Sequence, residues 1–387
     1  MLEKRFAAVE GASDALAVAS GQSATFLAIA NLCSGRPGDN VVASKYLYGN
    51  TWNLLFNTFK RLGIEARSAD PRDVTSFERM LDDRTIAMFG ETFSNPCLVP
   101  LPVPALVEIG ERRGIPVIVD NTTTPLICRP KALGADISTY SATKYLCGHG
   151  TTLGGLIVDN GSFAFDDAGR FPLFNDGDEA HGDILWKEAV LKLGDLGASP
   201  YLLKSRMTWL RDTGAAISPL ASFQLIQGLE TLHLRMQRHC ENAVAVAEFL
   251  NAHPKVARVS YPSLSSGYER ELVDELVDAR SLSSGYEREL VDELVDARVG
   301  YGAMIMFELG DEAAGRRFIT NIELMYHVSN VGDARTLVTH PVSTTHTTVP
   351  KEKREAAGIF DGSIRLCVGI ENIDDIVADL QRGLDAV

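Results

Sequence analysis

A lysine between hydroxyl residues and glycines is the first candidate for chemistry in this sequence. Lys144 follows Ser141 and Thr143, and a glycine-rich stretch at 148–155 comes after it. A lysine amine can form a Schiff base with a carbonyl compound, hydroxyls can bind a phosphate, and glycines let the backbone approach a ligand closely. A surface lysine in a polar loop has the same local composition, so this segment alone leaves both interpretations open.

Two other segments carry groups that suit a phosphorylated ring compound. The apolar run 117–119 ends at Asp120, and ligands of open α/β sheets bind beyond the carboxyl ends of strands. Asp120 could there keep a ring nitrogen protonated, although an aspartate in this place is as often a helix cap. Ser20, Gly21 and Gln22 precede the helical run 24–32, and a helix N-terminus offers N–H groups to a phosphate. Any capped helix has the same appearance.

Short apolar runs alternate with helix-length segments between residues 15 and 160. The runs lie at 40–43, 85–89, 117–119 and 155–158. Apolar runs of this length, bounded by turn residues, predict buried strands of a mostly parallel sheet. The first half is therefore predicted to be a layered α/β domain.

The second half is predicted to be a smaller α/β domain. Apolar residues recur at three- and four-residue spacing from Leu225 to Leu250, which predicts one long helix that Pro254 ends. Strands are expected at 303–307 and 364–368. We place a large domain at 1–230 and a small C-terminal domain at 231–387.

One segment is duplicated. Residues 263–280 are repeated without a difference at 281–298. Each copy has leucines and valines that fall on one side of a short amphipathic helix. Solenoid repeats diverge and occur at least three times, so an identical tandem pair indicates a recent duplication or an error in the sequence.

Composition limits the function classes. The net charge of −14 and the isoelectric point of about 5.1 disfavour nucleic acid and anionic membranes as partners. No apolar run reaches the roughly 18 residues of a membrane helix, and the N-terminus shows no secretory signal. The six cysteines are scattered singly, which favours free thiols in a reducing cytoplasm and no metal site.

Together these motifs resemble the Cys/Met-metabolism enzymes that use pyridoxal 5'-phosphate (PLP), the cystathionine γ-synthase-like family of fold type I. The resemblance covers nearly the whole chain. It rests on four segments in the family's order, namely Ser-Gly-Gln at 20–22, Tyr-Gly-Asn-Thr at 48–51, Glu-Thr-Phe-Ser-Asn-Pro at 91–96 and Ser-Ala-Thr-Lys-Tyr at 141–145 with the Gly-His at 148–149.

The resemblance implies a role for each site residue. Lys144 would be the Schiff-base lysine and general base, and Tyr48 would stack on the PLP ring and take part in catalysis. The other expected cofactor contacts are Gly21, Gln22, Ser141 and Thr143 at the phosphate, Asn95 at the phenolic oxygen and Asp120 at the ring nitrogen. Arg365 would bind the substrate α-carboxylate, with Ser329 on the same side of the pocket.

Within the family, the segments at 171–182, 228–236 and 332–341 are similar to those of sulfhydrylases that act on O-acetylhomoserine. Their reaction with sulfide or a thiol is a γ-replacement that releases acetate. Methionine γ-lyases usually have a cysteine where this chain has Asn50. Cystathionine γ-synthase, an O-succinylhomoserine sulfhydrylase, a γ-lyase and a weakly active subunit stay open as alternatives.

The resemblance also carries expectations about assembly. Family members form homodimers or homotetramers, and a Tyr-x-Arg motif from an N-terminal segment reaches the neighbouring subunit's PLP phosphate. This sequence contains no equivalent of that motif, so we expect the chain to lack the usual segment and to hold PLP less firmly.

Overall fold

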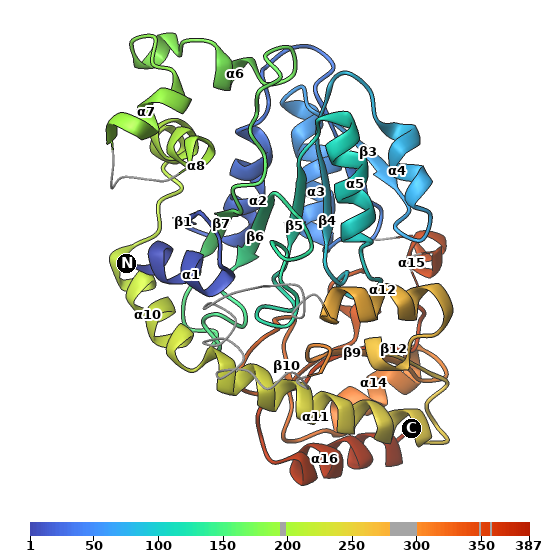
Figure 1. Cartoon of the computed structure of the whole chain (residues 1–387). Coiled ribbons are helices and arrows are strands. Elements are labelled where there is room, and N and C mark those ends of the chain that lie inside the picture. Colours follow the sequence, from blue (N-terminus) through green and yellow to red (C-terminus); the bar gives the residue numbers. More distant parts are fainter. Residues whose placement is uncertain (194–198, 279–299, 348–349, 357) are drawn as a thin grey trace.

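The computed structural model describes residues 1–193, 199–278, 300–347, 350–356 and 358–387. Two β-sheets organise the chain, one above the other in the view of Figure 1. The strands of the first sheet are β1 (Asp14–Val18), β2 (Asn40–Ser44), β3 (Glu65–Ala69), β4 (Thr85–Glu91), β5 (Val117–Asp120), β6 (Ile137–Ser141) and β7 (Gly155–Asp159).

The first sheet is mostly parallel, as predicted. Its strand order is β1-β7-β6-β5-β4-β2-β3, and only β7 runs antiparallel to its neighbours. The four apolar runs expected to be strands are β2, β4, β5 and β7. Three of these strands are buried along their whole length, and β5 is buried up to Asp120.

Helices cover both faces of this sheet. In β5, Val117 and Val119 belong to the core that includes helices α1 and α5, whereas Ile118 belongs to the core that includes α2. Burial on both faces explains why the strands read as continuous apolar runs. The helical segments here are α1 (Leu2–Glu10), α2 (Gly21–Ala30), α3 (Gly49–Asn53), η1 (Leu54–Phe59), α4 (Val74–Met80) and α5 (Val103–Arg113).

After β7 the chain forms a group of short helices, drawn in green in Figure 1. Their bounds are α6 (Pro172–Asn175), η2 (Glu179–His181), α7 (Trp186–Leu193), α8 (Pro200–Ser205), η4 (Arg206–Leu210) and α9 (Arg211–Thr213).

The passage to the second sheet consists of two helices, α10 (Pro219–Glu230) and α11 (Leu232–Ala252). The prediction of one continuous helix was wrong at Thr231, whose φ of −114° and ψ of 5° interrupt the helical backbone. The apolar stripe continues across this break, so the spacing gave no sign of it. α11 ends at Ala252 because His253 precedes a proline and is extended.

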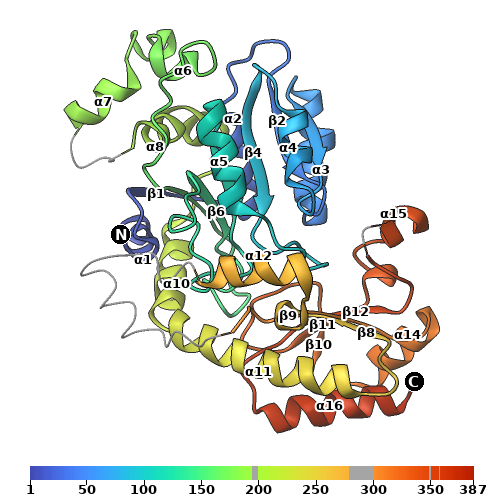
Figure 2. The ribbon, with the colours of Figure 1, turned by 45° about the vertical axis from the view of Figure 1, so that its right-hand side comes forward.

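The second sheet has the order β10-β11-β12-β9-β8 and is mostly antiparallel. Both expected strands are present, as β9 and β12. The helices α11, α14 and α16 pack together beside it (Figure 2). The elements are β8 (Arg258–Ser260), η5 (Pro262–Leu264), β9 (Met304–Glu308), α14 (Glu312–Asn321), β10 (Tyr326–His327), β11 (Leu337–Thr339), η7 (Pro341–Ser343), α15 (Lys351–Ala356), β12 (Ser363–Cys367) and α16 (Ile373–Asp385).

The first copy of the duplicated segment forms α12 (Gly267–Asp278), which lies between the two sheets (Figures 1 and 2). Leu272, Val273 and Leu276 are buried, in agreement with the amphipathic pattern. The second copy, 281–298, lies outside the described residues. No helix in the described ranges is both long and apolar enough to cross a membrane.

Candidate active site

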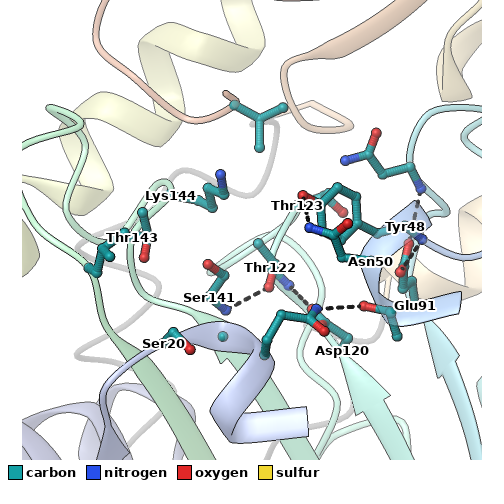
Figure 3. Close-up of a pocket in the computed structure, with 16 residues that line it drawn as sticks. Ser20, Tyr48, Asn50, Glu91, Asp120, Thr122, Thr123, Ser141, Thr143 and Lys144 are labelled. Carbon is teal, nitrogen blue, oxygen red and sulfur yellow. Dashed lines mark hydrogen bonds between the residues drawn. The ribbon is translucent and has the colours of Figure 1, made fainter. Parts of the chain in front are cut away.

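One pocket lies where β4, β5 and β6 end at Glu91, Asp120 and Ser141. These are the carboxyl ends of neighbouring parallel strands, the usual place for a ligand in an open α/β sheet. The lining residues are Ser20, Gly21, Gln22, Tyr48, Asn50, Thr51, Glu91, Asn95, Asp120, Thr122, Thr123, Ser141, Thr143, Lys144, Leu153 and Val331. All eight residues that the resemblance assigns to the cofactor are among them (Figure 3).

The N-terminus of α2 forms one side of the pocket. A Cβ on Gly21 would lie 2.6 Å from Cβ of Ser141, and a Cβ on Gly155 would lie 2.1 Å from the carbonyl oxygen of Ser20. Only glycine fits at these two places, and the close approach brings the first N–H groups of the helix beside the Ser141 side chain. Such N–H groups have no partner inside the helix and suit a phosphate. We call the N-terminus of α2, together with the Ser141 side chain, the phosphate cradle. This arrangement fits the phosphate of PLP.

Asp120 lies between the two sides of the pocket in Figure 3. Its Oδ1 accepts a hydrogen bond from the N–H of Thr122 at 2.9 Å. The Thr122 hydroxyl in turn accepts from the N–H of Ser141 at 2.7 Å, so the turn after β5 is fastened to the end of β6. Burial raises the pKa of Asp120. A partly desolvated carboxylate is well suited to pair with a protonated ring nitrogen, which would offset its desolvation.

Tyr48 lies on the side of the pocket opposite Ser20 and the N-terminus of α2, directly before the first residue of α3 (Figure 3). Its side chain is exposed, which is unusual for a large aromatic ring beside a pocket and fits a ring that stacks on a ligand. The Asn50 amide donates to the Tyr48 phenolic oxygen at 3.1 Å. The Gln22 amide donates to the Thr51 hydroxyl at 3.0 Å, which joins α2 to α3 across the pocket.

Lys144 projects into the pocket from the turn after β6. Burial, and secondarily the charge of Arg365, lower its pKa to about 8. A lysine with a lowered pKa is partly neutral near physiological pH and can act as nucleophile and base. Its Nζ donates to Oδ1 of Asn330. Sequence reasoning missed Asn330 and named only its neighbour Ser329.

Arg365 lies on β12 of the second sheet and is buried. Its Nη1 donates to Oδ1 of Asn95 at 3.1 Å, and its Nη2 donates to the carbonyl oxygen of Ser329 at 2.6 Å. Neither Arg365 nor Ser329 lines the pocket itself, but Asn95 does. Among the described residues, no carboxylate forms an ion pair with Arg365, which leaves its charge for a carboxylate ligand.

Glu91 is a second residue whose contacts sequence reasoning missed, although it begins the Glu-Thr-x-x-Asn-Pro motif. Its Oε1 accepts the N–H of Tyr48 at 2.6 Å and its Oε2 accepts the N–H of Asn95 at 3.0 Å. It lies beside Asp120 in the register of β4 and β5. Burial, and then the charge of Asp120, raise the pKa of Glu91 to about 8.

In the described part of the chain, no group of three or more His, Cys, Asp and Glu side chains could hold a metal ion. None of the six cysteines, all of which lie in the described ranges, forms a disulfide bond.

Comparison with known proteins agrees with this geometry. The profile of the family described as Cys/Met metabolism PLP-dependent enzyme matches residues 1–297 and, again, 281–385. The O-acetyl-L-homoserine sulfhydrylase of Leptospira meyeri is 41% identical over an alignment of 388 positions, which covers 99% of this chain and 83% of that protein. The homocysteine/cysteine synthase of Saccharomyces cerevisiae is also 41% identical, over 100% of this chain and 84% of that protein.

A crystal structure of a Campylobacter jejuni protein, assigned as an O-acetylhomoserine (thiol)-lyase, superposes with a TM-score of 0.87 and 35% identity. The match covers 99% of this chain and 85% of that one, which contains N'-pyridoxyl-lysine-5'-monophosphate. The expected α/β architecture of fold type I is confirmed. The chain belongs to the family of Cys/Met metabolism PLP-dependent enzymes.

Proposed function

We propose that the protein converts O-acetyl-L-homoserine and sulfide into L-homocysteine and acetate. The observation that carries this proposal is the convergence, in one pocket, of a half-buried lysine with a lowered pKa and a phosphate cradle, in a chain 41% identical to a relative named for this substrate. The C–O bond at the γ-carbon breaks, acetate leaves with its electron pair, and a C–S bond forms at the same carbon.

We assign the cofactor contacts as follows. Lys144 would hold PLP covalently, Tyr48 would stack on its ring, and Asp120 would pair with its ring nitrogen. The remaining contacts would be Gly21, Gln22, Ser141 and Thr143 at the phosphate and Asn95 at the phenolic oxygen. When bound, PLP supplies an electron-withdrawing ring that stabilises negative charge at the substrate's α-carbon.

The chain's own groups would then direct the protons and the substrate. As a free amine, Lys144 can remove and return protons at the α- and β-carbons, because its pKa of about 8 lies near working pH. The Asn330 amide oxygen would orient this amine. Arg365 would bind the α-carboxylate through two parallel N–H donors, and Ser329 would lie beside it.

Absorption spectroscopy with product analysis tests this proposal. The purified protein is saturated with PLP, and O-acetylhomoserine is added with and without sulfide. Homocysteine and acetate in equal amounts, formed only with sulfide, are the expected products. Ammonia and an α-keto acid without added thiol would instead indicate a γ-lyase. Cystathionine formed from added cysteine would indicate a cystathionine γ-synthase. A preference for the succinyl ester with sulfide would indicate an O-succinylhomoserine sulfhydrylase.

We further propose a large domain at 1–230 and a small domain at 231–387, in a homodimer or homotetramer of the cytoplasm, with neither nucleic acid nor membrane as a partner. Leu220, Phe223 and Leu234 on α10 and α11 are exposed, which favours a protein contact on this side. Light scattering of the PLP-saturated protein measures the assembly, and a monomeric mass would contradict it.

A further inference from the structure

Glu91 holds two pocket residues through their backbones. Its Oε1 accepts the N–H of Tyr48 at 2.6 Å, across 43 residues, and its Oε2 accepts the N–H of Asn95 at 3.0 Å. The carboxyl group is buried, with a residue exposure of 6%, and it lines the same pocket as both partners. Figure 3 shows Tyr48 and Glu91 on the same side of this pocket.

We infer that Glu91 is a positioning residue, which sets the places of Tyr48 and Asn95 against the PLP ring from the end of β4. This inference rests on the proposed function, because it takes from there the roles of these two residues. Tyr48 precedes the first residue of α3, so its N–H has no partner inside that helix. Glu91 thereby fixes where α3 begins and where the Tyr48 ring stands.

The contact with Asn95 extends the effect to the substrate side. The Asn95 side chain accepts a hydrogen bond from Arg365, whose guanidinium also donates to the carbonyl oxygens of Ser329 and Asn330. The Asn330 side chain contacts the Lys144 amine. A shift of the Asn95 backbone would therefore displace the guanidinium of Arg365 as well as the contact of Asn95 with the cofactor.

This role requires both carboxyl oxygens of Glu91 as hydrogen-bond acceptors. It does not depend on whether the carboxyl group is protonated. A protonated carboxyl group retains acceptor capacity on its oxygens, so the two contacts persist on either side of the raised pKa. An amide differs, because its nitrogen only donates. Glu91→Gln keeps the size of the side chain and turns one of the two acceptors into a donor that faces an N–H group.

The chain offers a matched control in Glu10. This glutamate is as buried as Glu91, with an exposure of 5%, and lies in the same half of the chain. Its Oε2 accepts from the Tyr140 hydroxyl at 2.7 Å, a bond that an amide oxygen can also accept. Glu10 does not line the pocket. Glu10→Gln is thus the same chemical change at an equally buried position.

Equilibrium titration of PLP into the apo-protein gives the first readout. We expect Glu91→Gln to raise the dissociation constant of PLP by roughly tenfold or more, as for a buried N–H group left without an acceptor, and Glu10→Gln to leave it within about twofold. Thermal melting of both apo-variants shows that they are folded. An unchanged PLP affinity in Glu91→Gln, or an equal loss in Glu10→Gln, would overturn the inference.

A double-mutant cycle separates positioning from support of the fold. If Glu91 acts through the Tyr48 ring, its substitution should weaken PLP much less when Tyr48→Ala has already removed that ring. Strictly additive losses would overturn the inference. Should Glu91→Gln be insoluble, Glu91→Asp enters the same cycle, since it withdraws the carboxyl group by one methylene. PLP affinity is measured without substrate, so a failure to form homocysteine would count against the proposed function and leave this test intact.

Discussion

Nη1 of Arg365 donates a hydrogen bond of 3.1 Å to Oδ1 of Asn95, which lies 270 residues earlier in the chain. Arg365 belongs to β12 of the second sheet, and Asn95 lines the pocket at the edge of the first sheet. The bond thus joins the part of the chain expected to hold the cofactor to the arginine expected to hold the substrate. Any movement of one sheet relative to the other would change the distance between the expected cofactor pocket and the arginine expected to bind the substrate.

Lys144→Ala should abolish the visible absorption band of the PLP-treated protein, because the covalent link to the cofactor is lost. In the native protein, borohydride should fix a pyridoxyl group on the peptide that contains Lys144. Lys204 is an internal control, since it is buried and its pKa is also lowered to about 8, yet its amine is bound to Asn31. A pyridoxyl group on Lys204 or another lysine would refute the assignment.

The reactivity of Lys144 should depend on Arg365. Only the neutral amine attacks an aldehyde, so the rate of PLP attachment should rise with pH through a midpoint at about 8, the pKa of Lys144, and level off above it. Arg365→Gln removes a positive charge that helps to lower this pKa, and the midpoint should move to higher pH. Arg365→Lys keeps the charge and should move it less. Stopped-flow absorbance of the apo-proteins gives both midpoints, and identical profiles would contradict the expectation.

Gly21→Ala should weaken PLP binding by at least about tenfold, equivalent to about 1.4 kcal/mol. The added Cβ would meet Cβ of Ser141 at 2.6 Å, so the N-terminus of α2 must move away from the phosphate position. Gly49→Ala is the matched control, because Gly49 begins α3 as Gly21 begins α2 and a Cβ there meets nothing within 4 Å. Fluorescence titration with PLP compares the two variants. Equal affinities would show that the cradle does not bind the phosphate.

The sequence predicted the end of β5 and the turn before α2 because each is a local feature. Asp120 ends a strand whose apolar run is visible in the sequence, and the turn before α2 is marked by small residues. The strand β6, which ends at Ser141, was not predicted, because hydroxyl residues interrupt its sequence and it forms no apolar run. The contacts of Glu91 and Asn330 could not be predicted in this way, since they span 43 and 186 residues and one of them uses a backbone N–H.

The interruption at Thr231 was missed for a different reason. One residue out of the helical conformation leaves the spacing of the apolar stripe unchanged, so periodicity cannot report it.

Glu10 should make the stability of the protein depend on pH. Burial raises its pKa from 4.5 to about 7, against the hydrogen bond from Tyr140 and the charge of Arg129, which lower it. The folded state therefore favours the protonated acid. The contribution of Glu10 to the free energy of unfolding is fully present below pH 4.5 and is lost as the pH rises through about 7. At higher pH the contribution changes no further.

Glu10→Gln should remove this loss, because the amide stays neutral and still accepts from Tyr140. At pH 8 the variant should be more stable than the native chain by up to roughly 3 kcal/mol, and at pH 4 the two should be alike. Urea unfolding of the apo-proteins at the two pH values measures the difference. A variant that is less stable at pH 8 would show that Glu10 is ionised and stabilising in the folded protein.

Deletion of residues 281–298 should leave folding and PLP binding intact or slightly improved. The first copy of the repeat already fills its place, with Leu272, Val273 and Leu276 buried, and two identical segments cannot occupy one place. Since each doubling of loop length costs only about 0.6 kcal/mol, removal of the extra copy should raise the melting temperature little.

Leu276→Ala sharpens the test of this deletion, because in the full chain the unmutated second copy can take the place of the first. We expect the substitution to cost about 2–5 kcal/mol in the shortened chain and much less in the full one. An insoluble deletion variant, or an equal cost in both chains, would show that the two copies are not interchangeable.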